Sequence, residues 1–340
     1  MIKQIFVLVS LSLALIVTGC GSSSDNDRTP ITIESLSHTG TLDVGQGGDV
    51  LAYKNYLFYI GWSSNADTFG IVDFSDPADP QLLSSLDMGS AYGIAFDGRY
   101  AYVETDGGGS GDFATTGSMF AIDCDDFTNP LYSDDNDAGY KSAYSNYLYG
   151  DILFNFSDSI IGVYDVSTPG QLNWLYNIPS DDAEFGDIQG SKMAMTGADT
   201  FTLFDISNSA TETTVLGTYN FEGNRSAYGA ALDGNTAYTF NGDSVADDRY
   251  VYALDISDQA NISVISTVPV DIDAGYKFMV IDDYLLLTGT KSFIVVDISD
   301  PENMVVVDSI TFSEYTWGFD VIGNYAIVAA SSTFEIVELQ

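Results

Sequence analysis

The sequence contains very few of the residues on which most enzyme active sites depend. Its 340 residues include one histidine, His38, and two cysteines, Cys20 and Cys124. A single histidine excludes a metal site built on a histidine pair, and two cysteines allow at most one disulfide. There is no glycine-rich phosphate loop and no closely spaced cysteine pair. The composition therefore favours a protein without catalytic activity, predicts no catalytic residue, and identifies no cofactor with certainty.

Positive charge is also scarce. Ten basic residues stand against 49 acidic ones, which gives a formal net charge of −39. A field of this sign repels nucleic acid and anionic lipid head groups, so we expect no nucleic-acid partner and no direct membrane contact by the protein surface. Nine of the acidic residues are Glu and the rest are Asp, which favours turns where strands reverse. Calcium binding is the alternative explanation, because hard cations take several carboxylate oxygens.

Residues 1–19 have the features of a secretory signal. Lys3 is followed by an apolar run from Ile5 to Val17 that is short for a membrane span. The run ends in Val-Thr-Gly-Cys, which resembles the lipobox of bacterial lipoproteins. The resemblance implies that the signal is removed, that Cys20 carries a lipid, and that residues 20–30 form a flexible tether. Gly21 after the cysteine implies an outer-membrane lipoprotein of a Gram-negative bacterium, on the periplasmic face or the cell surface.

A short apolar run that ends in aspartate recurs along the chain. The spacing between successive copies is 40 to 50 residues, and the aspartates are Asp73, Asp123, Asp165, Asp205, Asp255 and Asp297. A period of this size indicates a repeat array. Each unit divides into four β-branched and aromatic runs separated by turn residues, and no stretch has a sustained helical period. Four strands in about 42 residues is the size of one propeller blade.

The repeated aspartate has a structural interpretation. Its carboxylate can accept backbone N–H groups from the turn that follows. The segments 294–301 (IVVDISDP) and 70–77 (GIVDFSDP) resemble the LVIVD repeat of bacterial and archaeal surface proteins. The resemblance covers nearly all of the mature chain and implies a propeller, but the family has no defining reaction. Blade 2 departs from the repeat at Cys124, which we expect to be a buried apolar residue, and blade 4 lacks the proline; we expect both changes to loosen one turn.

Seven units fit within residues 31–340. The first six begin near Gly48, Tyr92, Gly139, Phe185, Tyr228 and Tyr276, and a seventh begins at Trp317 but lacks its fourth strand. The segment Ile31–Leu36 precedes the first unit, and we predict that it supplies the missing strand and closes the ring. The predicted fold is all-β: a seven-bladed β-propeller with four-stranded antiparallel blades in one domain, the last blade being closed by the N-terminal strand.

Strand alternation predicts one functional face. Loops that enter a blade and loops that join its second and third strands lie on the same side. Five aromatic residues that open innermost strands would ring the channel mouth there: Tyr92, Phe185, Tyr228, Tyr276 and Trp317. They would either line a funnel for a flat ligand or pack between blades. Five basic residues lie on this face and would either suit an anionic group or be there by chance. The candidate ligand contacts are Lys141, Arg225 and Lys277, and the other two are Arg249 and Lys291.

The two longest loops, 104–118 and 241–249, lie on the same predicted face. Their carboxylates are candidate calcium ligands, although the spacing matches no established calcium loop: Asp106, Asp112, Asp243, Asp247 and Asp248. The leading hypothesis is a monomeric, lipid-anchored propeller of the cell envelope that binds a protein, glycan or small molecule without catalysis. The alternatives are a calcium-dependent hydrolase of the lactonase kind and a structural scaffold of an envelope assembly.

Overall fold

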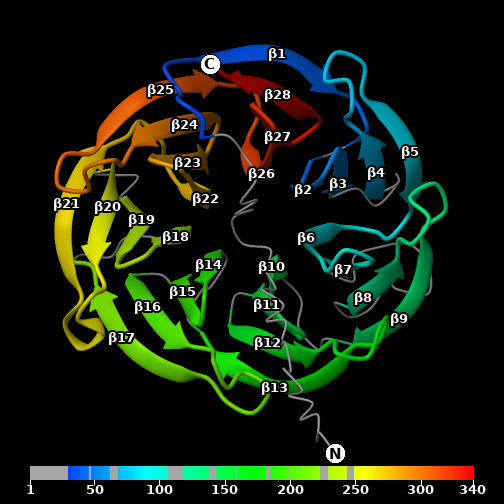
Figure 1. Ribbon diagram of the computed structural model, residues 1–340, viewed down its shortest axis with the longest axis horizontal. Coiled ribbons are helices and arrows are strands. Elements are labelled where there is room, and N and C mark those ends of the chain that lie inside the picture. Colours follow the sequence, from blue (N-terminus) through cyan, green and yellow to red (C-terminus); the bar gives the residue numbers. More distant parts are fainter. Residues whose placement is uncertain are drawn as a thin grey trace, which may run out of the picture.

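The computed structural model describes residues 30–45, 47–61, 68–105, 118–137, 143–157, 159–180, 185–197, 199–222, 229–242 and 249–340. Within these ranges, 28 strands form seven four-stranded antiparallel sheets arranged around a central axis (Figure 1). The sheets confirm the predicted seven-bladed β-propeller. A single short helical segment, η1 (Gln259–Asn261), accompanies them. Among the described residues, no helix has the length and apolar character needed to cross a bilayer.

Blades 1 to 6 each consist of four consecutive strands, ordered from the channel outwards (Figure 1). Blade 1 contains β2 (Asp49–Tyr53), β3 (Tyr56–Ile60), β4 (Phe69–Asp73) and β5 (Gln81–Leu86), and blade 2 contains β6 (Ala91–Phe96), β7 (Tyr100–Thr105), β8 (Ser118–Asp123) and β9 (Leu131–Asp137). Blade 3 contains β10 (Ala143–Tyr149), β11 (Ile152–Ser157), β12 (Ile160–Asp165) and β13 (Asn173–Pro179), and blade 4 contains β14 (Gly186–Gln189), β15 (Lys192–Thr196), β16 (Thr200–Asp205) and β17 (Thr214–Asn220). Blade 5 contains β18 (Ala230–Asp233), β19 (Thr236–Gly242), β20 (Arg249–Asp255) and β21 (Ser263–Pro269), and blade 6 contains β22 (Gly275–Ile281), β23 (Tyr284–Gly289), β24 (Ser292–Asp297) and β25 (Val305–Thr311).

Blade 7 joins the two ends of the chain. Its strands are β26 (Thr316–Ile322), β27 (Tyr325–Ala330), β28 (Phe334–Leu339) and, outermost, β1 (Leu36–Leu42). β1 pairs antiparallel with β28, with Leu36 opposite Leu339 and Leu42 opposite Phe334. Closure of the last blade by an N-terminal strand is therefore confirmed.

The predicted bounds of that strand, Ile31–Leu36, were wrong. The strand begins at Leu36, where the prediction ended it, and the residues before it cross the joint between blades 6 and 7. Ile33 is 2% exposed within the hydrophobic cluster of that joint. The N–H groups of Glu34 and Ser35 donate to the carbonyl of Gln340. The β-branched Ile33 gains more by burial between two blades than it would gain on an outer edge strand.

The repeated aspartates end each third strand as predicted. In six blades Oδ1 of the aspartate accepts the N–H of the residue two positions later, at 2.8–3.0 Å. Blade 2 keeps the same turn despite its different sequence, because Asp125 N–H still donates to Asp123 and Cys124 N–H to the Arg99 carbonyl. The expected loosening of the blade 2 turn is therefore absent. Cys124 is 1% exposed, and burial raises the pKa of its thiol to about 12, which confirms a structural role.

The core consists of the spaces between neighbouring blades. Seven hydrophobic clusters correspond to the seven joints of the ring. Between blades 5 and 6, for example, Phe240 and Val251 pack with Phe278 and Ile294. Each sheet buries both of its faces only because it has a neighbour on each side. The blades therefore stabilise one another, and the closed ring holds the innermost strands in place.

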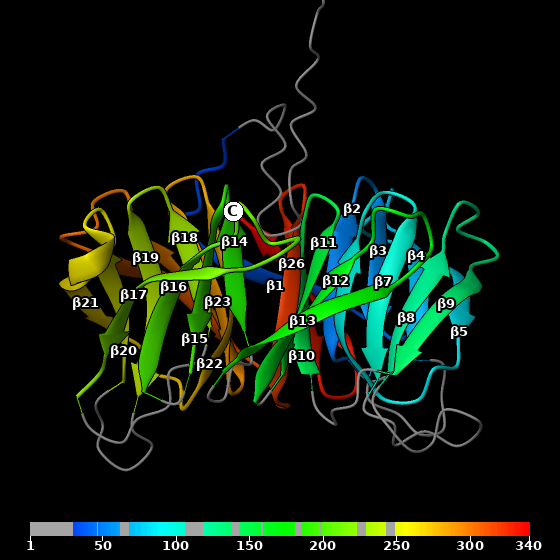
Figure 2. The same ribbon diagram turned by 90° about the horizontal axis from the view of Figure 1, so that it is seen from below.

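The two described chain ends lie on one face of the disc. The N–H of Gln340 donates to the carbonyl of Ser35 at 2.9 Å, and Figure 2 shows the C-terminus and the segment before β1 at the upper side. We call this side the terminal face. First and third strands of an antiparallel blade run in the same direction, so β26 begins at the side opposite to the end of β28. We call the side where the innermost strands begin the mouth face.

Candidate functional site

Four of the five predicted aromatic residues lie at the start of innermost strands on the mouth face, and the fifth, Tyr228, lies outside the described residues. β-bulges set the direction of three of them. The pairing register shifts across Tyr92 in β6, across Tyr276 in β22 and across Trp317 in β26. A bulge inserts an extra residue into one strand and re-aims its side chain. The bulges thus explain how side chains of separate blades reach a common place.

The aromatic rings contact one another at the end of the channel. The ring centroids are 4.9 Å apart for Tyr276 and Trp317, 6.3 Å for Phe185 and Tyr276, and 6.4 Å for Tyr144 and Phe185. Tyr92 lies 6.2 Å from Tyr144. Phe185 belongs to blade 4 and Tyr276 to blade 6, so their contact bypasses blade 5. We call these five residues the aromatic patch.

The members of the aromatic patch differ in exposure. Phe185 is 6% exposed and packs as a buried ring, whereas Tyr92, Tyr144, Tyr276 and Trp317 are half-buried. Rings in mutual contact form a partly exposed apolar surface rather than an open funnel. Such a surface can pack against a flat or apolar group, and the tyrosine hydroxyls supply polar edges.

Tyr144 is the member that the sequence prediction omits. It occupies the same kind of bulge in β10, between Ala143 and Ser145. It also lies eight residues before Ile152, the first residue of β11, just as Tyr92 lies eight residues before Tyr100. The same spacing therefore contains the signal that identifies it.

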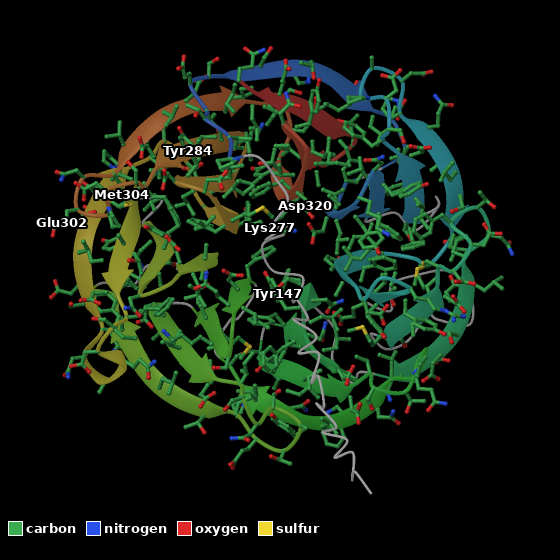
Figure 3. The ribbon with its side chains drawn as sticks, in the orientation of Figure 1. Tyr147, Lys277, Tyr284, Glu302, Met304 and Asp320 are labelled. Atoms are coloured by element: carbon green, nitrogen blue, oxygen red, sulfur yellow. The ribbon has the colours of Figure 1, made fainter. Side chains whose placement is uncertain are left out.

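Lys277, the residue after Tyr276 in β22, forms a buried ion pair in the channel. Its Nζ lies 2.9 Å from Oδ1 of Asp49 in blade 1, and the two side chains are 17% and 7% exposed. Asp320 of blade 7 adds a second negative charge, and its carboxylate accepts the N–H groups of Ala52 and Val321. Figure 3 shows Lys277, Asp320 and Tyr147 gathered near the centre of the ring. Blades 6, 7 and 1, which follow one another in the ring, therefore share one charged cluster.

One lysine is shared between two buried carboxylates. Burial raises the pKa of Asp49 and of Asp320, and the attraction of Lys277 offsets this only in part. Burial acts to lower the pKa of Lys277, but Asp49 and Asp320 together raise it above its ordinary value. The predicted contact of Lys277 with an anionic ligand stays a prediction. Such a ligand would have to compete with Asp49 for this lysine.

The lysine also breaks a local sequence pattern. An aromatic residue followed by glycine opens several innermost strands, as in 92–93, 185–186 and 317–318, whereas Tyr276 is followed by Lys277. A methyl group added to Gly93 would lie 2.9 Å from the backbone of Ser145, and one added to Gly318 would collide with the carboxylate of Asp49. These glycines allow neighbouring innermost strands to approach closely. Blade 6 instead places a buried charge at this position.

A third buried carboxylate links blades 4 and 5. The two oxygens of Asp187 accept the N–H groups of Leu232 and Ile188, each at 2.8 Å. Burial raises the pKa of Asp187 to about 6, although both hydrogen bonds act in the opposite direction. Asp320 makes the equivalent bond from blade 7 to Ala52 of blade 1. These two aspartates hold adjacent innermost strands together.

The remaining predicted site residues do not converge in the described structure. Arg249 pairs with Asp273 at 2.6 Å, and Lys291 donates to the Ser313 carbonyl. The single histidine, His38, was not a predicted site residue; it lies on β1, 2.7 Å from Glu335. Among the residues that the structure describes, no group of three or more His, Cys, Asp or Glu side chains could hold a metal ion. The following predicted residues lie outside the described ranges: Cys20, Lys141, Arg225, Asp106, Asp112, Asp243, Asp247 and Asp248. Lipidation and the calcium site therefore stay predictions.

Comparisons with known proteins agree with this architecture. The family model of the LVIVD repeat matches residues 44–87 and 278–311, in blades 1 and 6. The WD40 β-propeller domain of Doa1 is 12% identical and has a TM-score of 0.69, with 90% of this chain and 97% of that domain covered. A candidate 6-phosphogluconolactonase from Bacteroides fragilis NCTC 9343 is 14% identical, with a TM-score of 0.65 and coverage of 83% and 88%. The computationally designed Ika8 protein is 10% identical, with a TM-score of 0.61 and coverage of 92% and 98%. No curated protein matches the sequence, and at these identities the structural likeness concerns the fold alone.

Proposed function

Because this chain is an LVIVD-repeat β-propeller, we propose that it is a lipid-anchored, non-catalytic binding module of the cell envelope. In this proposal the aromatic patch on the mouth face captures an apolar or flat group of its partner. Propellers expose a rigid end of the channel, and binding residues are commonly carried on loops and strand ends held by such a scaffold.

The aromatic patch is the observation that carries the proposal. Five rings from five blades form a continuous series of contacts, and bulges in the innermost strands re-aim four of them. Tyrosine and tryptophan are enriched at binding surfaces because they bury much apolar area and keep a polar edge. The connections after Thr105 and after Gly242 join second to third strands and therefore leave from the same face.

The positions of the chain ends support an orientation for the anchored protein. The described chain begins on the terminal face, opposite to the aromatic patch. A lipid on Cys20 would connect to that face through residues 20–30, which span at most about 35 Å when extended. The mouth face would then point away from the membrane, towards soluble or surface partners. A Cys20→Ala variant should lack the lipid and leave the membrane fraction, which mass analysis of the mature N-terminal peptide can check.

Substitutions in the patch test the binding role. Purified wild type, Trp317→Ala and Tyr276→Ala would be immobilised and exposed to proteins and glycans released from the envelope. Trp174→Ala is the matched control, because Trp174 is 53% exposed on the outer strand β13 and far from the patch. We expect a partner that binds wild type and the control but is lost from both patch variants. Equal capture by all four folded proteins would overturn the proposal.

A further inference from the structure

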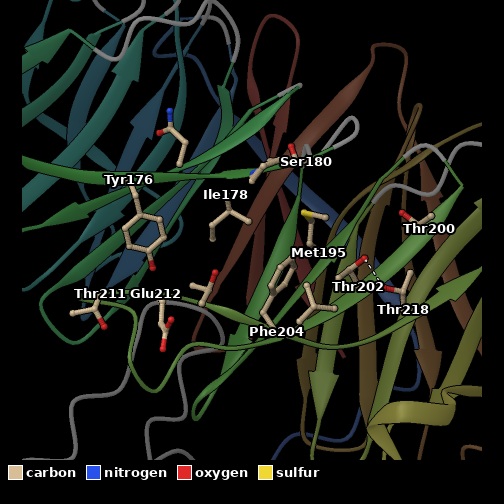
Figure 4. Close-up of a pocket in the computed structure, with 14 residues that line it drawn as sticks. Tyr176, Ile178, Ser180, Met195, Thr200, Thr202, Phe204, Thr211, Glu212 and Thr218 are labelled. Atoms are coloured by element: carbon tan, nitrogen blue, oxygen red, sulfur yellow. Dashed lines mark hydrogen bonds between the residues drawn. The ribbon is translucent and has the colours of Figure 1, made fainter.

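A groove with polar walls lies on the outer side of the ring, between blades 3 and 4. It has a volume of about 830 Å³ and is lined by β13 of blade 3 and by β15, β16 and β17 of blade 4 (Figure 4). The buried side chains of Ile178, Met195 and Phe204 form its apolar part. Its hydroxyl groups come from Ser180, Thr200, Thr202, Thr211, Thr213 and Thr218. The groove is separate from the aromatic patch, which lies at the channel.

One feature of the groove is the small residue that blade 4 carries where blades 2, 5 and 6 carry large ones. Thr202 stands three positions before the repeated aspartate of its blade. The same position holds Phe120 in blade 2, Tyr252 in blade 5 and Ile294 in blade 6, and each of these packs in the hydrophobic cluster with the preceding blade. Blades 1 and 3 have glycine there, and in blade 1 the ring of Tyr59 lies in the space beside Gly70. A threonine in place of such a side chain leaves space at this joint and adds a hydroxyl to its wall.

Hydrogen bonds fix one wall of the groove. The hydroxyl of Tyr176 on β13 donates to the carbonyl of Ser209 at 2.9 Å, so its ring spans from blade 3 to the turn that precedes β17. Thr202 and Thr218 face each other with their Oγ1 atoms 3.5 Å apart. A bond of this length is weak, and either hydroxyl can exchange it for a bond to a ligand. The wall is therefore preorganised while hydroxyl groups remain accessible.

The charge of the lining restricts the ligand. Glu212 is the only carboxylate among the lining residues, and no lysine, arginine or histidine joins it. The protein as a whole carries a net charge of −39, so an anionic ligand would be repelled. A ligand that matches both parts of the lining needs many hydroxyl groups and an apolar face. A neutral sugar ring has this combination, because its C–H face packs on apolar and aromatic side chains while its hydroxyls bond to threonine and carboxylate oxygens.

We propose that the groove between blades 3 and 4 binds a short neutral oligosaccharide. The volume falls within the range of small-ligand sites, about 300–1,000 Å³. The binding mode places a sugar ring against Tyr176 and the floor formed by Phe204 and Met195, with Glu212 and the threonine hydroxyls as hydrogen-bond partners. This site is independent of the partner captured by the aromatic patch.

Methyl NMR gives a direct test, because Met195 lies in the groove. The protein would be labelled with ¹³C-methyl methionine and titrated separately with maltotriose, cellotriose, xylotriose and triacetylchitotriose, each to about 10 mM, which detects dissociation constants near 1 mM. We expect one trisaccharide to shift the Met195 resonance in a saturable manner. The Met279 resonance serves as the internal control, because Met279 lies between blades 6 and 7 and should not move.

Three variants locate the binding site. Thr202→Phe imitates Phe120 of blade 2 and should fill the groove and abolish the Met195 shift. Tyr176→Ala should weaken binding about tenfold, because the stacking surface is lost. Tyr176→Phe keeps the ring, loses only the bond to Ser209, and should bind within about twofold of wild type. If Thr202→Phe does not fold, the comparison of Tyr176→Phe with Tyr176→Ala locates the site instead. Trp317→Ala should leave the Met195 shift unchanged, so failure at the aromatic patch and failure at the groove can be told apart.

Two results would overturn the proposal. The first is the absence of any saturable Met195 shift with all four trisaccharides. The second is a shift that persists in folded Thr202→Phe or that is equally weakened in Tyr176→Phe and Tyr176→Ala.

Discussion

Replacement of Lys277 by methionine should destabilise the propeller strongly at neutral pH and far less in mild acid. Lys277 Nζ lies 2.9 Å from Asp49 Oδ1, and both side chains are largely buried. At an effective dielectric constant of about 20, two unit charges at this distance attract by about 6 kcal/mol. Burial of methionine avoids the desolvation cost that burial of the lysine charge carries, and this offsets part of the lost attraction. We therefore expect a net loss of about 3–5 kcal/mol in the free energy of unfolding near pH 7.

The pH dependence identifies the cause. Without the lysine, the pKa values of Asp49 and Asp320 should rise further than burial alone already raises them. A carboxyl with a raised folded-state pKa stabilises the fold fully below its unfolded value of about 3.9, and this contribution is lost as pH rises through the folded pKa. The deficit of Lys277→Met relative to wild type should therefore shrink as pH falls from about 7 to about 5. The double variant Asp49→Asn with Lys277→Met should regain most of the loss at neutral pH, because one buried charge is removed.

Urea unfolding followed by tryptophan fluorescence measures these differences, with wild type, both single variants and the double variant compared at each pH. A methionine variant within about 1 kcal/mol of wild type at neutral pH would refute the reasoning, since removal of one partner of a buried pair should cost more. A deficit that is the same at both pH values would also refute it, because protonation of Asp49 and Asp320 would then play no part.

Three further predictions follow from single contacts. Asp187, whose pKa is raised to about 6, should make the fold lose about 3 kcal/mol of stability as pH rises from about 4 to about 7; Asp187→Asn should lack this pH-dependent part in urea unfolding, and an unchanged slope would contradict it. Gly318→Ala should destabilise by about 1–3 kcal/mol through its collision with Asp49, while Gly40→Ala, which meets only a side-chain methyl at 3.9 Å, should stay within about 0.5 kcal/mol in the same assay. Cys124, 1% exposed and with a thiol pKa of about 12, should react with a thiol reagent only as fast as the protein unfolds, and rapid labelling of folded protein would count against a buried structural thiol.

The architecture was largely predictable because it repeats. Each blade contributes an independent copy of the same signals, so an error in one unit is corrected by the others. The aspartate that ends each third strand is the clearest case, since its turn is local and depends on two residues only. The closing strand was placed too early because it depends on non-local packing. Ile33 is β-branched and therefore has a high β-propensity, which favoured a strand at this position. Its burial between blades 6 and 7, however, is a property of the closed ring.

The candidate site was predictable only where it follows the repeat. The spacing of aromatic residues identified Tyr92, Phe185, Tyr276 and Trp317, and applied to blade 3 it also identifies Tyr144. The bulges that bring these rings together were not predictable, because a bulge depends on the partner strand. The pairing of Lys277 with Asp49 joins residues 228 positions apart and depends on the closure of the ring. The groove was not predictable, because it depends on how β13 of blade 3 packs against β15, β16 and β17 of blade 4.

The pairing of β1 with β28 has a consequence for the biogenesis of the protein. β1 is synthesised before the other 27 described strands, and its partner β28, Phe334–Leu339, is synthesised after them. Until then the earliest strand has an unpaired edge, and contacts of such long sequence separation form slowly. The growing chain must therefore keep this edge from pairing with other chains until β28 has been synthesised. A chaperone that covers Leu36–Leu42 would protect this edge during that interval.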